Sequence, residues 1–346
     1  MVSDSEGGRT PHAATDRAAQ QAFRYSCRNR GRQSAVRMRD RPTHLHDMLA
    51  WYADHFVLPL PETHRFPMDK YRRLRERVAA ELPGVTLSEP PAATDAELCR
   101  AHDAGYVDRA SRGELSVNEI RMIGFPWSAQ MIERSRRSAG ATMAACRSAL
   151  RDGVSVNLAG GTHHAKRASG AGYCVFNDSA VAARMLQAEC GIERVAIVDL
   201  DVHQGDGTAE ILGRADDVFT LSLHGDRNFP FRKERSHLDV ALPDGCGDDA
   251  YLAALDDALT RMSARFDPQF ILFLAGADPF EGDRLGRLKL TKPGLAARDA
   301  RVFDYCRRRD LPLAVAMAGG YAEDIADIVD IHFATVAAAL HHATTR

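Results

Sequence analysis

Long hydrophobic runs and paired cysteines are missing from this sequence. None of its apolar runs approaches the roughly 20 residues that a membrane-spanning helix needs, and no signal peptide is visible. The chain has seven cysteines but no Cys-x-x-Cys pair, which argues against a disulfide framework and against a thiolate zinc site. Such cysteines are typical of reduced thiols, so we expect a cytoplasmic protein without a membrane span.

The chain also lacks a large excess of charge of either sign. Its formal net charge is −2 over 346 residues, which gives no field that would attract nucleic acid or an anionic membrane. We therefore expect no direct nucleic acid binding. A composition of 45% hydrophobic and 27% charged residues is that of an ordinary globular protein, and the length suits one large α/β domain.

The first 47 residues differ from the rest of the chain. They are rich in Arg, Ser, Ala and Gln, contain no Lys, and show no sustained hydrophobic period. We predict that residues 1–47 form a disordered extension to a single folded domain over 48–346. A transit peptide is a weaker interpretation, because the segment carries several acidic residues. Translation from Met38 or Met48 is a further hypothesis, which mass spectrometry of the native N-terminus would test.

Strand-like and helix-like segments alternate through the remaining chain. Apolar runs predict a first strand over 51–57 and further strands that begin at 154, 195, 218, 270 and 313. Periodic segments predict helices over 67–82, 94–109, 128–150, 177–189, 208–212, 248–265, 293–308 and 323–341, the second with a capping box. The predicted fold class is α/β: a single-domain three-layer αβα sandwich with a mostly parallel central sheet and right-handed crossovers.

One predicted strand carries the strongest functional signal. Residues 195–198 form a short apolar run, and Asp199, Asp201 and His203 follow at alternate positions. In extended backbone these three side chains point to one side. Two carboxylates and an imidazole at the carboxyl end of a strand suit a divalent metal, and open parallel sheets bind ligands at that edge.

Three other predicted strands end in residues of catalytic types. One leads to Asp278, one to a glycine pair followed by Tyr321, and one through a glycine turn to His163 and His164. Because the carboxyl ends of parallel strands meet at one edge of a sheet, we expect a single site assembled from four strand ends.

Asp201, His203 and Asp278 are the predicted metal ligands. Three protein ligands leave one coordination position open, as in a catalytic zinc site. The same donors accept iron, manganese or cobalt, so the residues alone do not fix the identity of the metal. Taken alone, Asp278 would be explained equally well as a helix N-cap or a turn carboxylate.

The adjacent histidines are predicted to do acid–base work beside the metal. Successive side chains diverge, so His163 and His164 cannot easily bind the same ion from one strand. They can flank it, because imidazole titrates near neutral pH, and Asp199 and Asp206 are suitably placed in the sequence to orient them. The Tyr321 hydroxyl could donate a hydrogen bond to a developing oxyanion.

Five segments, taken in order, match one known family. They are 160–165 (Gly-Gly-Thr-His-His-Ala), 172–178 (Gly-Tyr-Cys-Val-Phe-Asn-Asp), 199–207 (Asp-Leu-Asp-Val-His-Gln-Gly-Asp-Gly), Ala277-Asp278 with Gly282-Asp283, and Gly319-Gly320-Tyr321. In order and spacing, from about residue 50 to 340, they resemble the zinc-dependent histone deacetylase family of the arginase–deacetylase fold. Segments 64–68 (His-Arg-Phe-Pro-Met) and 282–286 (Gly-Asp-Arg-Leu-Gly) look most like the class IV branch and its bacterial relatives.

The resemblance implies that residues 48–346 are a histone deacetylase-like catalytic domain that hydrolyses amides. The implied roles are one Zn²⁺ held by Asp201, His203 and Asp278, a general base and acid at His163 and His164, orienting carboxylates at Asp199 and Asp206, and an oxyanion donor at Tyr321. A monovalent cation such as K⁺ is implied at Asp199, Asp201, His203 and Ser222. The implied substrate residues are Gly172, Tyr173 and Phe229 along a narrow lysine tunnel and Leu285 at its rim; exposed loop aromatics are also expected as binding walls.

The predicted function is removal of acyl groups, acetyl or longer, from Nε-acyl-lysine in a protein or peptide, or from a related acylated amine. Two alternatives are an acylpolyamine or other small-molecule amidohydrolase and a catalytically inactive acyl-lysine binding module. A binuclear ureohydrolase would need further carboxylates where Pro279 and Phe280 follow Asp278. Gln204 and Tyr173 depart from the commonest family pattern, so acyl length and substrate stay open, as does the oligomeric state.

Overall fold

The centre of the molecule is one eight-stranded sheet in which all neighbouring strands run parallel. The computed structural model describes residues 48–58, 60–61 and 64–345. Within them the strands are β1 (Met48–Trp51), β2 (Val85–Ser88), β3 (Val154–Asn157), β4 (Val195–Asp199), β5 (Val218–Gly225), β6 (Leu238–Leu242), β7 (Phe270–Leu274) and β8 (Leu313–Ala316). Their order across the sheet is β2-β1-β3-β8-β7-β4-β5-β6.

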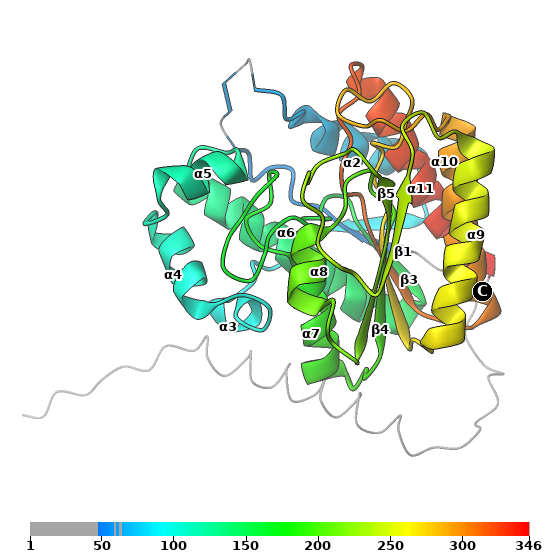
Figure 1. Cartoon of the computed structure of the whole chain (residues 1–346), viewed down its shortest axis with the longest axis horizontal. Coiled ribbons are helices and arrows are strands. Elements are labelled where there is room, and N and C mark those ends of the chain that lie inside the picture. The colour runs from blue at the N-terminus through cyan, green and yellow to red at the C-terminus, as the bar shows by residue number, and fades with distance from the viewer. Residues whose placement is uncertain (1–47, 59, 62–63, 346) are drawn as a thin grey trace, which may run out of the picture.

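Helices cover both faces of the sheet, which confirms the predicted three-layer αβα sandwich (Figure 1). They are α2 (Asp69–Glu81), α3 (Asp95–Leu98), α4 (Ala104–Arg112), α5 (Val117–Ile123), α6 (Ala129–Asp152), α7 (Asp178–Cys190), α8 (Asp206–Leu212), α9 (Asp248–Arg265), α10 (Lys292–Arg308) and α11 (Ile325–Thr345). One layer contains α2, α9, α10 and α11, and the other contains α6, α7 and α8 with the short helices α3 to α5 beside them. No helix in the described part of the chain is long and apolar enough to cross a membrane.

The central strands are rich in apolar residues because both of their faces are buried. In β4, Val195 and Ile197 pack into the core beneath α6 and α7, whereas Ala196 and Val198 pack into the core beneath α9 to α11. All four side chains are fully buried. The sheet therefore separates two hydrophobic cores, and the residues after each strand emerge at its carboxyl edge.

The structure corrects several expected element boundaries. The first strand covers Met48–Trp51 instead of 51–57, and the helix expected over 94–109 is divided into α3 and α4. The division occurs because Asp103 begins a new helix, its side chain accepting a hydrogen bond from the Tyr106 amide. The capping box predicted at Thr94 and Glu97 is confirmed at the start of α3.

Three elements were not expected from the sequence. The strands β2 and β6 form the two edges of the sheet, and several of their side chains are exposed, so neither has the continuous apolar run of a central strand. The third element, α5, has only seven residues. The sheet is wholly parallel where a mostly parallel one was predicted. The extension predicted over residues 1–47 lies outside the described residues.

Candidate metal centre and active site

Four neighbouring strands deliver the predicted site residues to one edge of the sheet. The order β3-β8-β7-β4 places the carboxyl ends of these strands side by side. The loops that follow them carry, in the same order, the histidine pair, Tyr321, Asp278, and the Asp199 to Asp206 segment. Residues far apart in sequence therefore meet because of strand order, as expected for the ligand-binding edge of an open parallel sheet.

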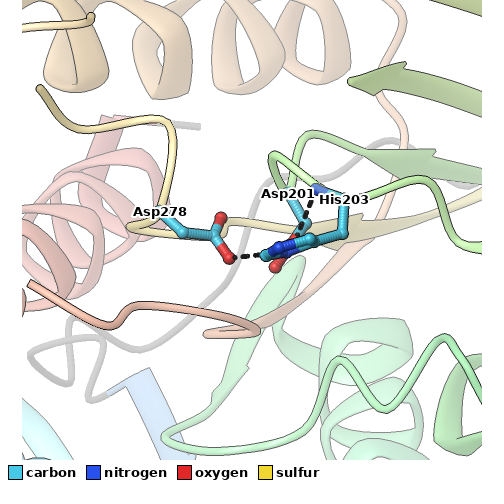
Figure 2. A group of neighbouring side chains, drawn as sticks. All are labelled: Asp201, His203 and Asp278. Atoms are coloured by element: carbon cyan, nitrogen blue, oxygen red, sulfur yellow. Dashed lines mark hydrogen bonds and ion pairs between the residues drawn. The ribbon is translucent and has the colours of Figure 1, made fainter. Parts of the chain in front are cut away.

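Asp201, His203 and Asp278 converge on one point (Figure 2). One ligand atom from each lies within 4.8 Å of the others, and all three residues are buried. The His203 Nδ1 atom lies 3.0 Å from Asp201 Oδ1 and 3.2 Å from Asp278 Oδ2. One nitrogen and two carboxylates in this arrangement are a donor set that a divalent cation such as Zn²⁺ accepts.

The electrostatics of the triad favour a positive charge at its centre. Burial disfavours the imidazolium form of His203, but Asp201 and Asp278 outweigh burial and raise its pKa to about 10. Burial and the nearby Asp201 charge raise the pKa of Asp278 to about 7. Two buried carboxylates in contact are costly unless a cation compensates them, so the site is suited to a metal ion.

Two further details of the triad fit a bound ion. The Asp278 Oδ2 atom is buried and lies 3.2 Å from His203 Nδ1, which is itself a candidate ligand atom. Gly319 lies so close that a β-carbon there would clash with the carboxylates of both Asp278 and Asp201. The amide of Gly319 instead donates to Asp201 Oδ2 at 2.8 Å, which fixes that carboxylate. The Asp278 oxygen thus faces the imidazole of another candidate ligand, where a metal ion would bind.

Each of the two adjacent histidines is paired with its own carboxylate. His163 Nδ1 lies 2.7 Å from Asp199 Oδ2, and His164 Nδ1 lies 2.7 Å from Asp206 Oδ1. Burial opposes protonation of His163, but Asp199 and Asp201 outweigh it and raise the pKa of this imidazole to about 9. Burial and the neighbouring charge of His163 lower the pKa of His164 to about 4. The His163 imidazole therefore binds a proton more tightly than the His164 imidazole.

The loop that carries the histidines is held by a carboxylate to which sequence analysis gave no role. Asp178, at the start of α7, is fully buried and accepts hydrogen bonds from the amides of Gly161 and Thr162 at 2.9 and 2.8 Å. It also accepts one from the Thr142 hydroxyl on α6 at 2.6 Å. The only signal for this residue in the sequence was its place in the Asn-Asp motif at 177–178.

Tyr321 is buried at the end of the β8 loop. Its ring centroid lies 6.4 Å from that of His203, and its amide donates to Asp283 Oδ2 at 2.6 Å. Burial, with the nearby charges of Asp278 and Asp201, raises the pKa of the Tyr321 hydroxyl well above its ordinary value. The hydroxyl therefore keeps its proton and is able to donate it in a hydrogen bond.

The predicted substrate residues are not all equally close to the site. A cavity of about 40 Å³ is lined by Gly172 and Tyr173 together with both histidines and Tyr321. Phe229 does not line this cavity, but its ring packs edge-on against that of His164 with centroids 4.8 Å apart. A β-carbon on Gly172 would lie 2.6 Å from His164, so only glycine fits there. Leu285 also lies outside the cavity lining and is partly buried in the core beneath α6 and α7.

Ser222, the fourth member of the predicted monovalent cation site, lies on β5 directly opposite Asp199 on β4. It is buried, and its hydroxyl lies 2.9 Å from His224 Nδ1. The structure therefore brings together all the predicted ligand and acid–base residues and sets Ser222 behind them. Leu285 is the predicted residue that is least involved.

Comparisons with known proteins agree with this geometry. Residues 64–344 match the family model of the histone deacetylase domain. An uncharacterised protein of Picosynechococcus sp. is 41% identical over 285 residues, which cover 81% of this chain and 94% of that protein. The histone deacetylase-like amidohydrolase of Pseudomonas aeruginosa is 34% identical over 289 residues, which cover 77% of this chain and 74% of the amidohydrolase.

A solved structure, the HD domain of HDA15, has a similar fold. Its TM-score is 0.72 at 23% identity, and the match covers 87% of this chain and 90% of that domain. At this identity the likeness concerns the fold alone, which is the arginase–deacetylase fold expected from the sequence. Because the family model covers residues 64–344 and the Pseudomonas aeruginosa relative is 34% identical over most of its length, the chain belongs to the histone deacetylase family.

Proposed function

We propose that this protein is a metal-dependent deacylase that hydrolyses the amide of Nε-acyl-lysine, or of a related acylated amine. One observation carries the proposal: a buried triad of ligand type and two His–Asp pairs lie around the same small cavity. Family membership supports hydrolysis of an amide, because one relative is named an amidohydrolase. A module that only bound acyl-lysine would have no use for paired acid–base histidines.

In the proposed reaction, metal binding and the first proton transfer are assigned to different residues of the chain. Asp201, His203 and Asp278 would hold Zn²⁺, which when bound would polarise the acyl carbonyl and lower the pKa of the attacking water. His163, oriented by Asp199, accepts a proton from that water. The carboxylate charge that raises the pKa of His163 would be offset by a cation held at the triad, and the nitrogen of His163 would then be free to act as a base.

The second half of the reaction needs an acid and an oxyanion donor. His164, oriented by Asp206, donates a proton to the nitrogen of the leaving amine as the C–N bond breaks, so that the lysine leaves as a neutral amine. The Tyr321 hydroxyl donates a hydrogen bond to the negative charge that develops on the oxygen of the acyl carbonyl. Gly172 and Tyr173 would contact the methylenes of the acylated side chain at the cavity mouth.

Three finer features of the proposal rest on the sequence. A K⁺ ion near Asp199, Asp201, His203 and Ser222 and membership of the class IV branch follow from the resemblance, and a cytoplasmic location follows from cysteines typical of reduced thiols. The register that sets Ser222 opposite Asp199 supports the first of them.

A panel of acylated substrates tests the proposed function. Zinc-loaded protein is incubated with Nε-acyl-lysine peptides from acetyl to myristoyl and with an acetylated polyamine, with and without a chelator. We expect release of the acyl group that stops with chelator and returns when Zn²⁺ is added. A chelator already saturated with Zn²⁺ is the control. Acyl release that continues at the same rate in the presence of chelator would contradict the metal mechanism. Activity on the polyamine alone would identify a small-molecule amidohydrolase.

Tyr321→Phe is expected to lower kcat by about 10²–10³-fold, because removal of one oxyanion donor has this effect in other hydrolases. The change removes only an oxygen, so the fold and metal content should be unchanged. Tyr305→Phe is the matched control, since the Tyr305 hydroxyl bonds to Ser263 between α9 and α10, away from the cavity. Steady-state kinetics and metal analysis of both variants check this; a fully active Tyr321→Phe enzyme would leave the mechanism without its oxyanion donor.

A further inference from the structure

A buried ion pair lies behind the metal ligands, on the α10 and α11 side of the sheet. Arg298 on α10 is completely buried. Its Nε atom donates to Asp299 Oδ1 at 2.9 Å, and its Nη2 atom lies 2.8 Å from the same oxygen. The other Asp299 oxygen accepts a hydrogen bond from the Thr335 hydroxyl on α11 at 2.6 Å. Asp299 thus holds the guanidinium on α10 and is itself tied to α11.

The remaining face of the guanidinium contacts the two loops that carry metal ligands. Arg298 Nη1 donates to the carbonyl of Gly276 at 2.5 Å and to that of Leu200 at 3.4 Å. Leu200 directly precedes Asp201, and Gly276 lies two residues before Asp278. One side chain therefore bridges the ends of β4 and β7 just before each aspartate ligand.

The backbone that Arg298 holds is itself in contact with the ligands. A β-carbon at Gly276 would lie 2.8 Å from Asp201 Oδ2 and 2.8 Å from Asp278 Oδ1. The Val202 amide, next to Asp201 in the loop after β4, donates to Asp278 Oδ1 at 3.0 Å. A small displacement of either carbonyl would therefore change the separation of the two carboxylates.

Stability of the fold does not explain this arrangement. Ion pairs that are removed from water gain little over apolar side chains of the same volume, and replacing them is often neutral or stabilising. What a planar guanidinium supplies, and an apolar side chain cannot, is several donors in a fixed geometry. Here Nη1 is directed at the two loops, while Nε donates to Asp299 on α10.

We propose that Arg298 is a positioning residue that sets the spacing of Asp201 and Asp278 and so determines how tightly the site binds its metal. The inference rests on the proposed function, since it assumes that the triad is a metal site. It assigns to the ion pair of α10 a role in metal affinity that is separable from the stability of the fold.

The test compares metal affinity with stability in the full-length protein. Two variants are made: Arg298→Lys, and Arg298→Met combined with Asp299→Leu, which leaves no unpaired buried charge. Zn²⁺ affinity is measured by competition with a fluorescent chelator, and bound Co²⁺ is examined by its visible absorption spectrum. We expect both variants to bind Zn²⁺ about 10–100-fold more weakly, as residues that support metal ligands usually do when replaced, with a changed Co²⁺ spectrum.

Thermal unfolding of the metal-free proteins separates the two roles. The double variant should unfold cooperatively at or above the wild-type temperature while its Zn²⁺ affinity falls. Arg301→Met is the matched control, because Arg301 lies on the same helix and pairs with Asp256 at the surface. Wild-type Zn²⁺ affinity and an unchanged Co²⁺ spectrum in Arg298→Lys and in the double variant would overturn the inference, and Arg298→Lys decides alone if the double variant does not fold. Failure of the wild-type protein itself to bind Zn²⁺ would instead overturn the metal centre on which the inference rests.

Discussion

Asp201→Ala is expected to remove bound metal and hydrolytic activity together, with kcat/KM reduced at least about 10³-fold. The size follows from the several kcal/mol that a catalytic metal contributes, since each 1.36 kcal/mol is about tenfold in rate. Asp201 has a second role, because Gly319 on the β8 loop donates to its carboxylate, so the substitution also loosens the loop that carries Tyr321. Metal content by atomic absorption and kinetics on the best peptide substrate measure the two effects.

The control for this variant is Asp267→Ala. Asp267 is an exposed carboxylate in the loop before β7, at the edge of the sheet opposite to the site, and it pairs at the surface with Arg194. The Asp267→Ala variant loses a carboxylate just as Asp201→Ala does, and it should keep both its metal and its activity. An Asp201→Ala protein with full metal occupancy would remove Asp201 from the set of ligands.

His164→Ala should separate catalysis from metal binding. His164 bonds to Asp206 and packs against the ring of Phe229, and its ring centroid lies 5.8 Å from that of the candidate ligand His203. Loss of a general acid costs about 10²–10⁴-fold in rate, so kcat should fall by this factor while metal content is unchanged. Kinetics and atomic absorption on the same preparation provide both values.

Two comparisons make the His164 result decisive. His237→Ala serves as the control. His237 is a half-buried histidine directly before β6, and it bonds to Thr220 in β5. It should leave kcat unchanged. If His164→Ala lost its metal, the histidine would be part of the metal site or of its support, and the assignment of an acid role would be wrong.

The chemistry of the site could be predicted from sequence because it follows strand ends. An apolar strand followed by alternating carboxylates and an imidazole is a local pattern, and in a parallel sheet all such ends meet at one edge. The pairs His163–Asp199 and His164–Asp206 were anticipated for the same reason, since both members of each pair follow central strands.

The supporting residues could not be predicted, because their roles depend on contacts between distant segments. Arg298 in the middle of α10 has the same local sequence appearance as a surface arginine, yet the packing of α10 and α11 buries it completely. Asp178 looks like an ordinary residue in the first turn of a helix. The edge strands β2 and β6 were not predicted for a related reason. Some of their side chains are exposed, so their sequences lack the continuous apolar run by which a buried strand is identified.

The place of β8 in the sheet has a consequence for how the protein is made. It is the last strand of the described residues, yet it lies between β3 and β7, so it joins the half of the sheet that contains β1 to β3 with the half that contains β4 to β7. During synthesis from the N-terminus, these two halves have no central partner until residues 313–316 leave the ribosome. Tyr321 and Gly319 follow that strand, so a nascent chain that ends before residue 313 has all three proposed metal ligands but neither a continuous sheet nor the proposed oxyanion donor. The proposed activity therefore requires that residues 313–321 have been made and have entered the sheet edge.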